Sequence, residues 1–195
     1  MATKDGLQIV IQKKRAKPFS LRRGVKSVQQ IVGDKFPALD EVYKFISLSG
    51  GFSSICFILW VASHEPILEL TASTLRIGAK QFGELCRLRQ NKKLFAARFF
   101  VSNMMIEVDK KSEKYNYADR LYKIAQDNGW QFITVNNHSK IILMRTANNF
   151  FVLETSSNLN ENPKIEQYSF EDDKELYQFY YGFFNDLQTA KEKTP

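Results

Sequence analysis

One short stretch of the chain combines side-chain types that can attack a phosphodiester. His138 offers an imidazole that can act as a nucleophile, and Lys140 offers an ammonium that can hold phosphate oxygens. Further along, the chain supplies a hydroxyl at Ser156, a carboxamide at Asn158 and a carboxylate at Glu166. Together these groups could bind a tetrahedral anion, attack it and stabilise the charge that develops on its oxygens.

The segments around these residues are expected to be paired strands. Side chains alternate along a β-strand, so His138 and Lys140 would share one face, with Ser139 on the other. Residues 146–149 have turn composition, and the apolar run 150–153 predicts a strand that returns antiparallel. The returning strand would carry Ser156 and Asn158 back toward the histidine.

These residues resemble the phospholipase D superfamily. Its signature is histidine, any residue, lysine, four residues and aspartate, followed later by glycine, serine, any residue and asparagine. The resemblance implies that His138 is the nucleophile and that Lys140 and Asn158 hold the phosphate oxygens. It further implies that Ser156 adds a hydroxyl and that Glu166 orients the imidazole.

The sequence departs from that signature at two positions. Arg145 stands where the family usually has aspartate, and Thr155 replaces the glycine. With its single histidine-lysine motif, the segment looks like the smaller nuclease-like and phage-type members, some of which lack the aspartate and use a later glutamate. The resemblance therefore implies a metal-independent phosphodiesterase that acts on nucleic acid, with DNA as the expected substrate, through a phosphohistidine. A protein that grips phosphates without cutting, such as a DNA-binding or phage assembly protein, is the alternative.

The same resemblance implies a homodimer. Family members bring two motifs together across a twofold or pseudo-twofold axis, and this chain has one motif. Two copies of His138 would then face each other, one as nucleophile and one as general acid, through an isologous interface. The aromatic residues of 177–184 have helical spacing that favours a core or a dimer interface.

Strand and helix patterns alternate along most of the chain, which predicts an α/β fold with a mixed, largely parallel sheet and helices on both faces. Strands are expected at 42–48, 67–72, 94–101 and 130–136, and helices at 53–63, 74–90, 115–128 and 172–187. The resemblance implies the same sandwich. We expect a basic N-terminal arm over 1–36, one domain over 37–190 and a short tail over 191–195.

Composition narrows the class of protein. The 195 residues are 44% hydrophobic, enough for one sizeable core. The longest apolar stretch, 55–62, is too short to span a bilayer, and no signal-peptide pattern is present, so we expect a cytoplasmic protein of a bacterial or phage-infected cell. The two histidines and two cysteines lack the spacing of zinc ligands, and no phosphate-binding glycine loop occurs. We therefore expect neither a metal nor a cofactor.

The net charge of +7 favours a polyanionic partner, because contacts with phosphates release counterions. Much of this charge is concentrated in the arm. The arm could lie along nucleic acid, or it could be a solvated leader that aids solubility. Its candidate nucleic-acid contacts are Lys13, Lys14, Arg15, Lys17, Arg22 and Arg23.

Overall fold

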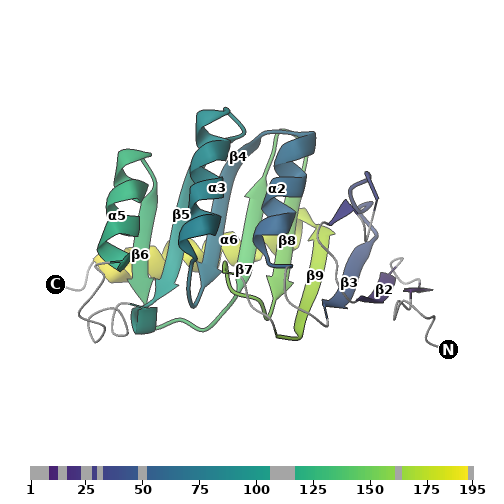
Figure 1. Ribbon diagram of the computed structural model, residues 1–195. Helices are drawn as coiled ribbons and strands as arrows, with labels where there is room; N and C mark the ends of the chain where they lie inside the picture. The colour runs from purple at the N-terminus through teal and green to yellow at the C-terminus, as the bar shows by residue number, and fades with distance from the viewer. Residues whose placement is uncertain are drawn as a thin grey trace.

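The computed structural model describes residues 9–12, 17–22, 28–29, 33–47, 52–105, 117–160 and 164–192. Within these segments, nine strands form one sheet and four longer helices cover it (Figure 1). The strands are β1 Ile9–Gln12, β2 Lys17–Arg22, β3 Val42–Ser47, β4 Ile67–Thr74, β5 Leu94–Ser102, β6 Gln131–Val135, β7 Ile141–Arg145, β8 Phe150–Thr155 and β9 Glu166–Asp172. The helices are α2 Ile55–His64, α3 Ala79–Gln90, α5 Tyr117–Asp127 and α6 Lys174–Glu192.

The sheet is mixed, with the strand order β1-β2-β3-β9-β8-β7-β4-β5-β6. Only β2–β3, β4–β5 and β5–β6 pair in parallel, and the other neighbouring described strands are antiparallel. The prediction of a largely parallel sheet is therefore wrong, whereas the mixed α/β class is confirmed. The cause lies in the connections, because no helix is described between β7, β8 and β9, and short connections join antiparallel neighbours.

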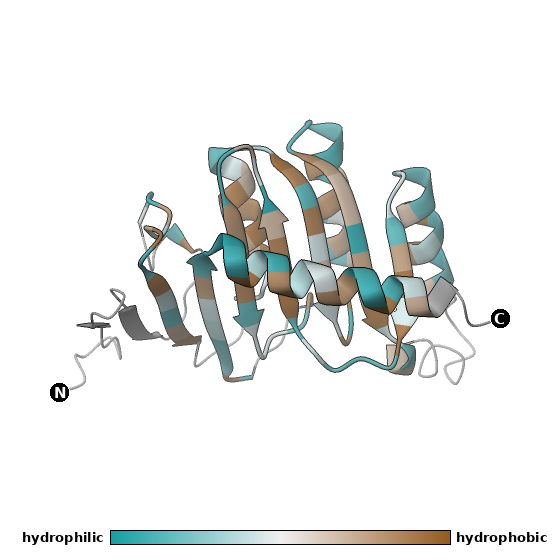
Figure 2. Ribbon diagram, turned by 180° about the vertical axis from the view of Figure 1, so that it is seen from behind, coloured by the Kyte–Doolittle hydropathy of each residue, from teal (hydrophilic) through white to brown (hydrophobic). Residues whose placement is uncertain are grey.

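Helices cover both faces of the sheet, as predicted. Helices α2, α3 and α5 pack side by side on one face, while α6 crosses the other face (Figures 1 and 2). Each face therefore has its own core. On β5, Phe99 points into the large core under the three helices, and Phe100 points to the opposite side, where its ring stacks on Phe184 of α6 at 4.8 Å.

The helices differ from the predicted ones mainly at their starts. The predicted 74–90 helix begins only at Ala79, because the hydroxyl of Thr74 donates to the Arg76 carbonyl and accepts from the Leu159 amide. These bonds hold the preceding residues in a turn beside Leu159. Helix α5 ends as predicted, with Gly129 in the left-handed region at φ 70°.

Strand β9 was not predicted. Glu166 is the first residue of β9 and pairs with Ser47 of β3. Within the predicted arm, β1 and β2 pair with each other, and β2 continues the sheet beyond β3. The domain boundaries at 36 and 190 stay predictions.

The topology gathers several chain ends at one edge of the sheet. Strands β3, β4, β5, β6 and β8 end there, while β7 and β9 begin there. We call this the site edge, because the predicted catalytic residues belong to the segments that meet at it. Separately, no helix in the described part of the chain is both long and apolar enough to cross a membrane.

Candidate active site

His138 lies in the segment just before β7 and not in a strand, so that part of the prediction is wrong. The reason is the side chain of Asn137, which takes the place of strand hydrogen bonds. Its Oδ1 accepts from the amide and the hydroxyl of Ser139, at 2.9 and 2.7 Å. Its Nδ2 donates to Ser73 Oγ at 2.8 Å and to the Phe100 carbonyl at 3.2 Å. Asn137 thereby ties the His138 segment to β4 and β5.

His138 and Lys140 lie next to each other despite the irregular backbone. The Lys140 ammonium is 3.5 Å from Nδ1 of the His138 ring and donates to the His138 carbonyl at 2.7 Å. The His138 side chain is exposed, so a substrate can reach it. Partial burial lowers the pKa of Lys140, while the nearby Glu166 carboxylate acts to raise it. An oxyanion bound at this ammonium would therefore lie beside the imidazole.

Asn158 follows β8 at the site edge and is held in a defined orientation. Its side-chain Oδ1 accepts from the Leu75 amide at 3.1 Å and from the Thr74 hydroxyl at 3.4 Å. The carbonyl oxygen of the Asn158 carboxamide is bound to the end of β4, so the Nδ2 group, with its two N–H donors, points away from that strand end. The geometry suits a donor to a phosphate oxygen.

Ser156 and Glu166 form a hydrogen-bonded pair across the β8–β9 junction. The Ser156 hydroxyl donates to the Glu166 carboxylate and accepts from the Gln167 amide at 3.0 Å. Glu166 is buried, with 5% of its surface exposed. Its charge acts on the pKa of both Lys140 and Tyr168, which places it within electrostatic reach of the lysine. The predicted contact of Glu166 with the imidazole stays a prediction.

Several supporting residues were missed by the sequence analysis. Helix α2 begins at the site edge, but the hydroxyl of its N-terminal residue, Ser54, does not cap the helix. It donates instead to the Ser157 carbonyl at 2.9 Å and fixes the loop that carries Asn158. The positive end of the α2 dipole also faces this edge, which favours an anion there.

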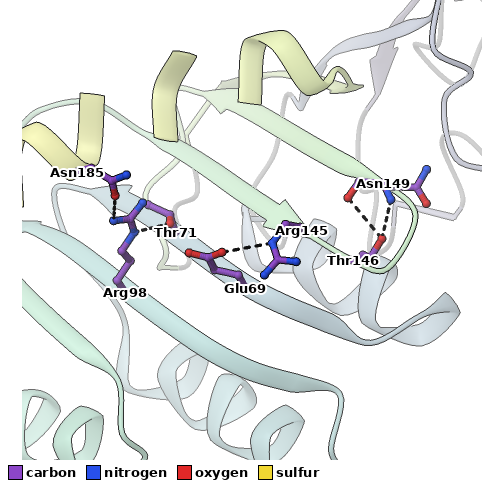
Figure 3. Close-up of polar contacts among 7 residues, drawn as sticks. All are labelled: Glu69, Thr71, Arg98, Arg145, Thr146, Asn149 and Asn185. Atoms are coloured by element: carbon purple, nitrogen blue, oxygen red, sulfur yellow. Dashed lines mark hydrogen bonds and ion pairs between the residues drawn. The ribbon is translucent and has the colours of Figure 1, made fainter. Parts of the chain in front are cut away.

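The two residues that depart from the family signature have structural partners. Arg145 sits at the far end of β7, away from His138, and its Nε lies 3.3 Å from a carboxylate oxygen of Glu69 (Figure 3). Thr155 donates its hydroxyl to the Gln167 carbonyl at 2.7 Å and accepts from the Ser157 amide at 2.9 Å. Thr155 therefore stabilises the turn after β8.

The structure describes few of the basic residues predicted in the N-terminal arm. Lys13, Lys14, Arg15 and Arg23 lie outside the described residues, and Lys17 and Arg22 are described only as the backbone ends of β2. Across the segments that are described, no three histidine, cysteine or acidic side chains are grouped so that they could hold a metal ion. Cys56 and Cys86 are not joined in a disulfide, and both are only partly buried.

No protein-family profile matches the sequence, and no curated protein matches it. Several solved structures match the fold of this chain. Nuc from Salmonella typhimurium, a phospholipase D family member, matches with a TM-score of 0.50 and 13% identity over 75% of this chain and 93% of that chain. The chain has a phospholipase D fold.

A polyphosphate kinase from Porphyromonas gingivalis has a similar fold, with a TM-score of 0.54 and 15% identity. The match covers 72% of this chain and 24% of the kinase chain, so this chain spans about a quarter of the kinase's length. At these identities the likeness concerns the phospholipase D fold alone, and the roles of individual residues follow from their chemistry.

Proposed function

We propose that this chain is a metal-independent phosphodiesterase that cleaves nucleic acid, with DNA as its substrate, through a phosphohistidine. The observation that supports the proposal is that the segments carrying His138 and Lys140, Asn158, and the Ser156–Glu166 pair all reach one sheet edge. Nucleophile, cation, amide donor and carboxylate thus lie on neighbouring chain segments. The net charge of +7 supports a polyanionic substrate.

In the proposed first step, a neutral ring nitrogen of His138 attacks phosphorus while the bond to the leaving oxygen breaks. Lys140 and Asn158 stabilise the charge on the non-bridging oxygens, and such a donor is typically worth about 3 kcal/mol. Glu166 accepts a hydrogen bond from the other ring nitrogen of His138 and thereby fixes the tautomer of the imidazole. Water then cleaves the phosphohistidine and restores the imidazole.

The leaving oxygen needs a proton, which we assign to His138 of the partner subunit in a homodimer. The support for dimerisation is on α6, whose inner side packs Tyr177 and Phe184 on the sheet while its outer side presents Phe179 and Phe183. The side chains of Phe179 and Phe183 are 68% and 52% exposed. Two large apolar side chains one turn apart on an exposed helix face suit a subunit contact. We further propose a cytoplasmic location in a bacterial or phage-infected cell.

The experiment is cleavage of plasmid and single-stranded DNA by the purified protein in excess chelator. We expect wild type to cut and His138→Ala to lose at least about a thousandfold in rate, because the nucleophile is gone. His64→Ala is the matched control, since His64 bonds backbone carbonyls at the far end of α2. Equal cleavage by His138→Ala would contradict the mechanism.

The same experiment separates a second function. Arg145 occupies the family's aspartate position and is engaged with Glu69, which suits a protein that binds phosphates without cutting them. Salt-sensitive DNA binding by wild type without any cleavage would identify that non-catalytic role.

A further inference from the structure

A second set of polar side chains lies beneath α6, on the face of the sheet away from the three helices. On β4, Leu70 and Ala72 pack into the large core, whereas the alternate residues Glu69 and Thr71 face α6. Arg98 of the neighbouring strand β5 joins them (Figure 3). Polar residues in the middle of a covered sheet face are costly unless each group has a partner.

Arg98 has only part of the partners that it needs. Its side chain is almost wholly buried, with 7% of the residue exposed. Its Nε donates to Thr71 Oγ1 at 2.7 Å and its Nη1 donates to Asn185 Oδ1 at 2.5 Å, both neutral acceptors. The guanidinium lies 4.4 Å from the Tyr181 ring centre. Among the described residues, its Nη2 has no hydrogen-bond partner.

The charges around Arg98 do not balance. Glu69 is the carboxylate of the cluster, and it already pairs with Arg145 at 3.3 Å and accepts a hydrogen bond from Tyr181. Two guanidinium groups therefore share one carboxylate. A buried cation without its own counter-charge is strongly unfavourable, so an additional anion would stabilise this arrangement.

A neutral donor completes the cluster. The hydroxyl of Tyr177 is buried and has no partner among the described residues. Burial raises the pKa of Tyr177, and the charges of Glu69, Arg145 and Arg98 also act on it, so the hydroxyl lies within their reach and keeps its proton at neutral pH. The Arg145 side chain is 39% exposed, so the cluster reaches solvent at Arg145, whereas Arg98 Nη2 and the Tyr177 hydroxyl are fully buried and the side chains around them must shift to admit an ion.

We propose that Arg98, Arg145 and Tyr177 form a binding site for a small oxyanion such as inorganic phosphate. The donors are Arg98 Nη2 and the Tyr177 hydroxyl, which have no partner among the described residues, together with the Nη atoms of Arg145. Guanidinium groups match the planar or tetrahedral oxygens of such ions. Glu69 pairs with Arg145 at a position four residues along β4 from Ser73, and Ser73 lies at the site edge. The proposed oxyanion site is therefore separate from His138.

The test measures inorganic phosphate binding by calorimetry and by thermal unfolding, in a His138→Ala, Lys140→Ala background that weakens phosphate binding at the site edge. We expect saturable binding and a rise in Tm of about 3 °C near saturation. Sodium chloride at equal ionic strength is the reference titration. Arg98→Met and Tyr177→Phe should each weaken phosphate binding about tenfold.

Two controls keep the result decisive. Arg87→Met removes the same charge from an exposed arginine on α3 that pairs with Glu84, and it should bind phosphate as the background protein does. Tyr177→Phe keeps the ring that packs on Phe150 and loses only the hydroxyl, so it remains informative if Arg98→Met does not fold. Absence of saturable binding, an equal effect of chloride, or unchanged affinity in folded Tyr177→Phe would overturn the proposal.

Discussion

At the scale of single residues, the environment of Lys140 determines how the proposed site responds to pH. Its ammonium is partly buried, which lowers its pKa, and Glu166 only partly opposes that effect. The group therefore loses its proton at a lower pH than an ordinary lysine. Since the neutral amine cannot stabilise a phosphoryl oxygen's charge, the proposed reaction should slow as pH rises through this pKa.

Lys140→Arg tests this assignment. The guanidinium stays charged to much higher pH, so the alkaline fall in cleavage rate should move upward, even though the changed geometry lowers the maximal rate. The measurement is the pH dependence of kcat/KM for DNA cleavage in wild type and variant. An alkaline limb at the same pH in both proteins would show that another group titrates there.

At the scale of elements, the segment between β6 and β7 is held to the sheet largely by side-chain hydrogen bonds, and its Lys140 carbonyl accepts from the Thr155 amide of β8 at 3.1 Å. Asn137 connects Ser139 to Ser73 of β4 and to the Phe100 carbonyl of β5, and the Ser139 hydroxyl also bonds Ser73 Oγ directly at 2.6 Å. Periodicity could not foresee this, because an asparagine beside a histidine carries no strand or helix pattern. The predicted alternation of His138, Ser139 and Lys140 presumed a strand, which this segment does not form.

Asn137→Ala should release the His138 segment. Each lost hydrogen bond is worth about 1 kcal/mol, so we expect about 1 to 3 kcal/mol less stability and a lower kcat for DNA cleavage. Denaturant unfolding and cleavage kinetics measure the two effects. Asn136→Ala is the matched control, because Asn136 is exposed in the adjacent position and should change neither quantity. A wild-type kcat in Asn137→Ala would show that this side chain does not position the histidine.

At the scale of the whole molecule, the proposed mechanism needs two chains. The exposed pair Phe179 and Phe183 on α6 is the surface that we expect to bring them together. Replacing both by Glu should give a monomer, because charged side chains are costly to bury in an interface. Light scattering measures the assembly state of the variant. The rate of DNA cleavage should fall as dimerisation is lost.

Mixed dimers provide an independent check of the same arrangement. With equal amounts of wild-type and His138→Ala chains, heterodimers should lose activity, because each reaction uses one histidine as nucleophile and the other as acid. Full activity for every wild-type chain present would indicate that one subunit carries the whole reaction.

The sequence by itself determined the kinds of elements and the set of reactive groups. Apolar periodicity located α5, β5 and the antiparallel β7–β8 pair, because these patterns depend on which side of a local element is buried. The residues His138, Lys140, Ser156, Asn158 and Glu166 could be chosen from their chemistry alone. The structure does bring their segments to one sheet edge.

Only the tertiary structure decided how the strands pair and which polar groups meet. Strand direction depends on which distant segments bury one another, so β9 and the mostly antiparallel sheet were missed. Arg145 was interpreted from its place in a motif, but its partner Glu69 is 76 residues away in the chain. A contact between residues so far apart in the chain depends on the pairing of β4 with β7 beneath α6. No local sequence pattern encodes that pairing.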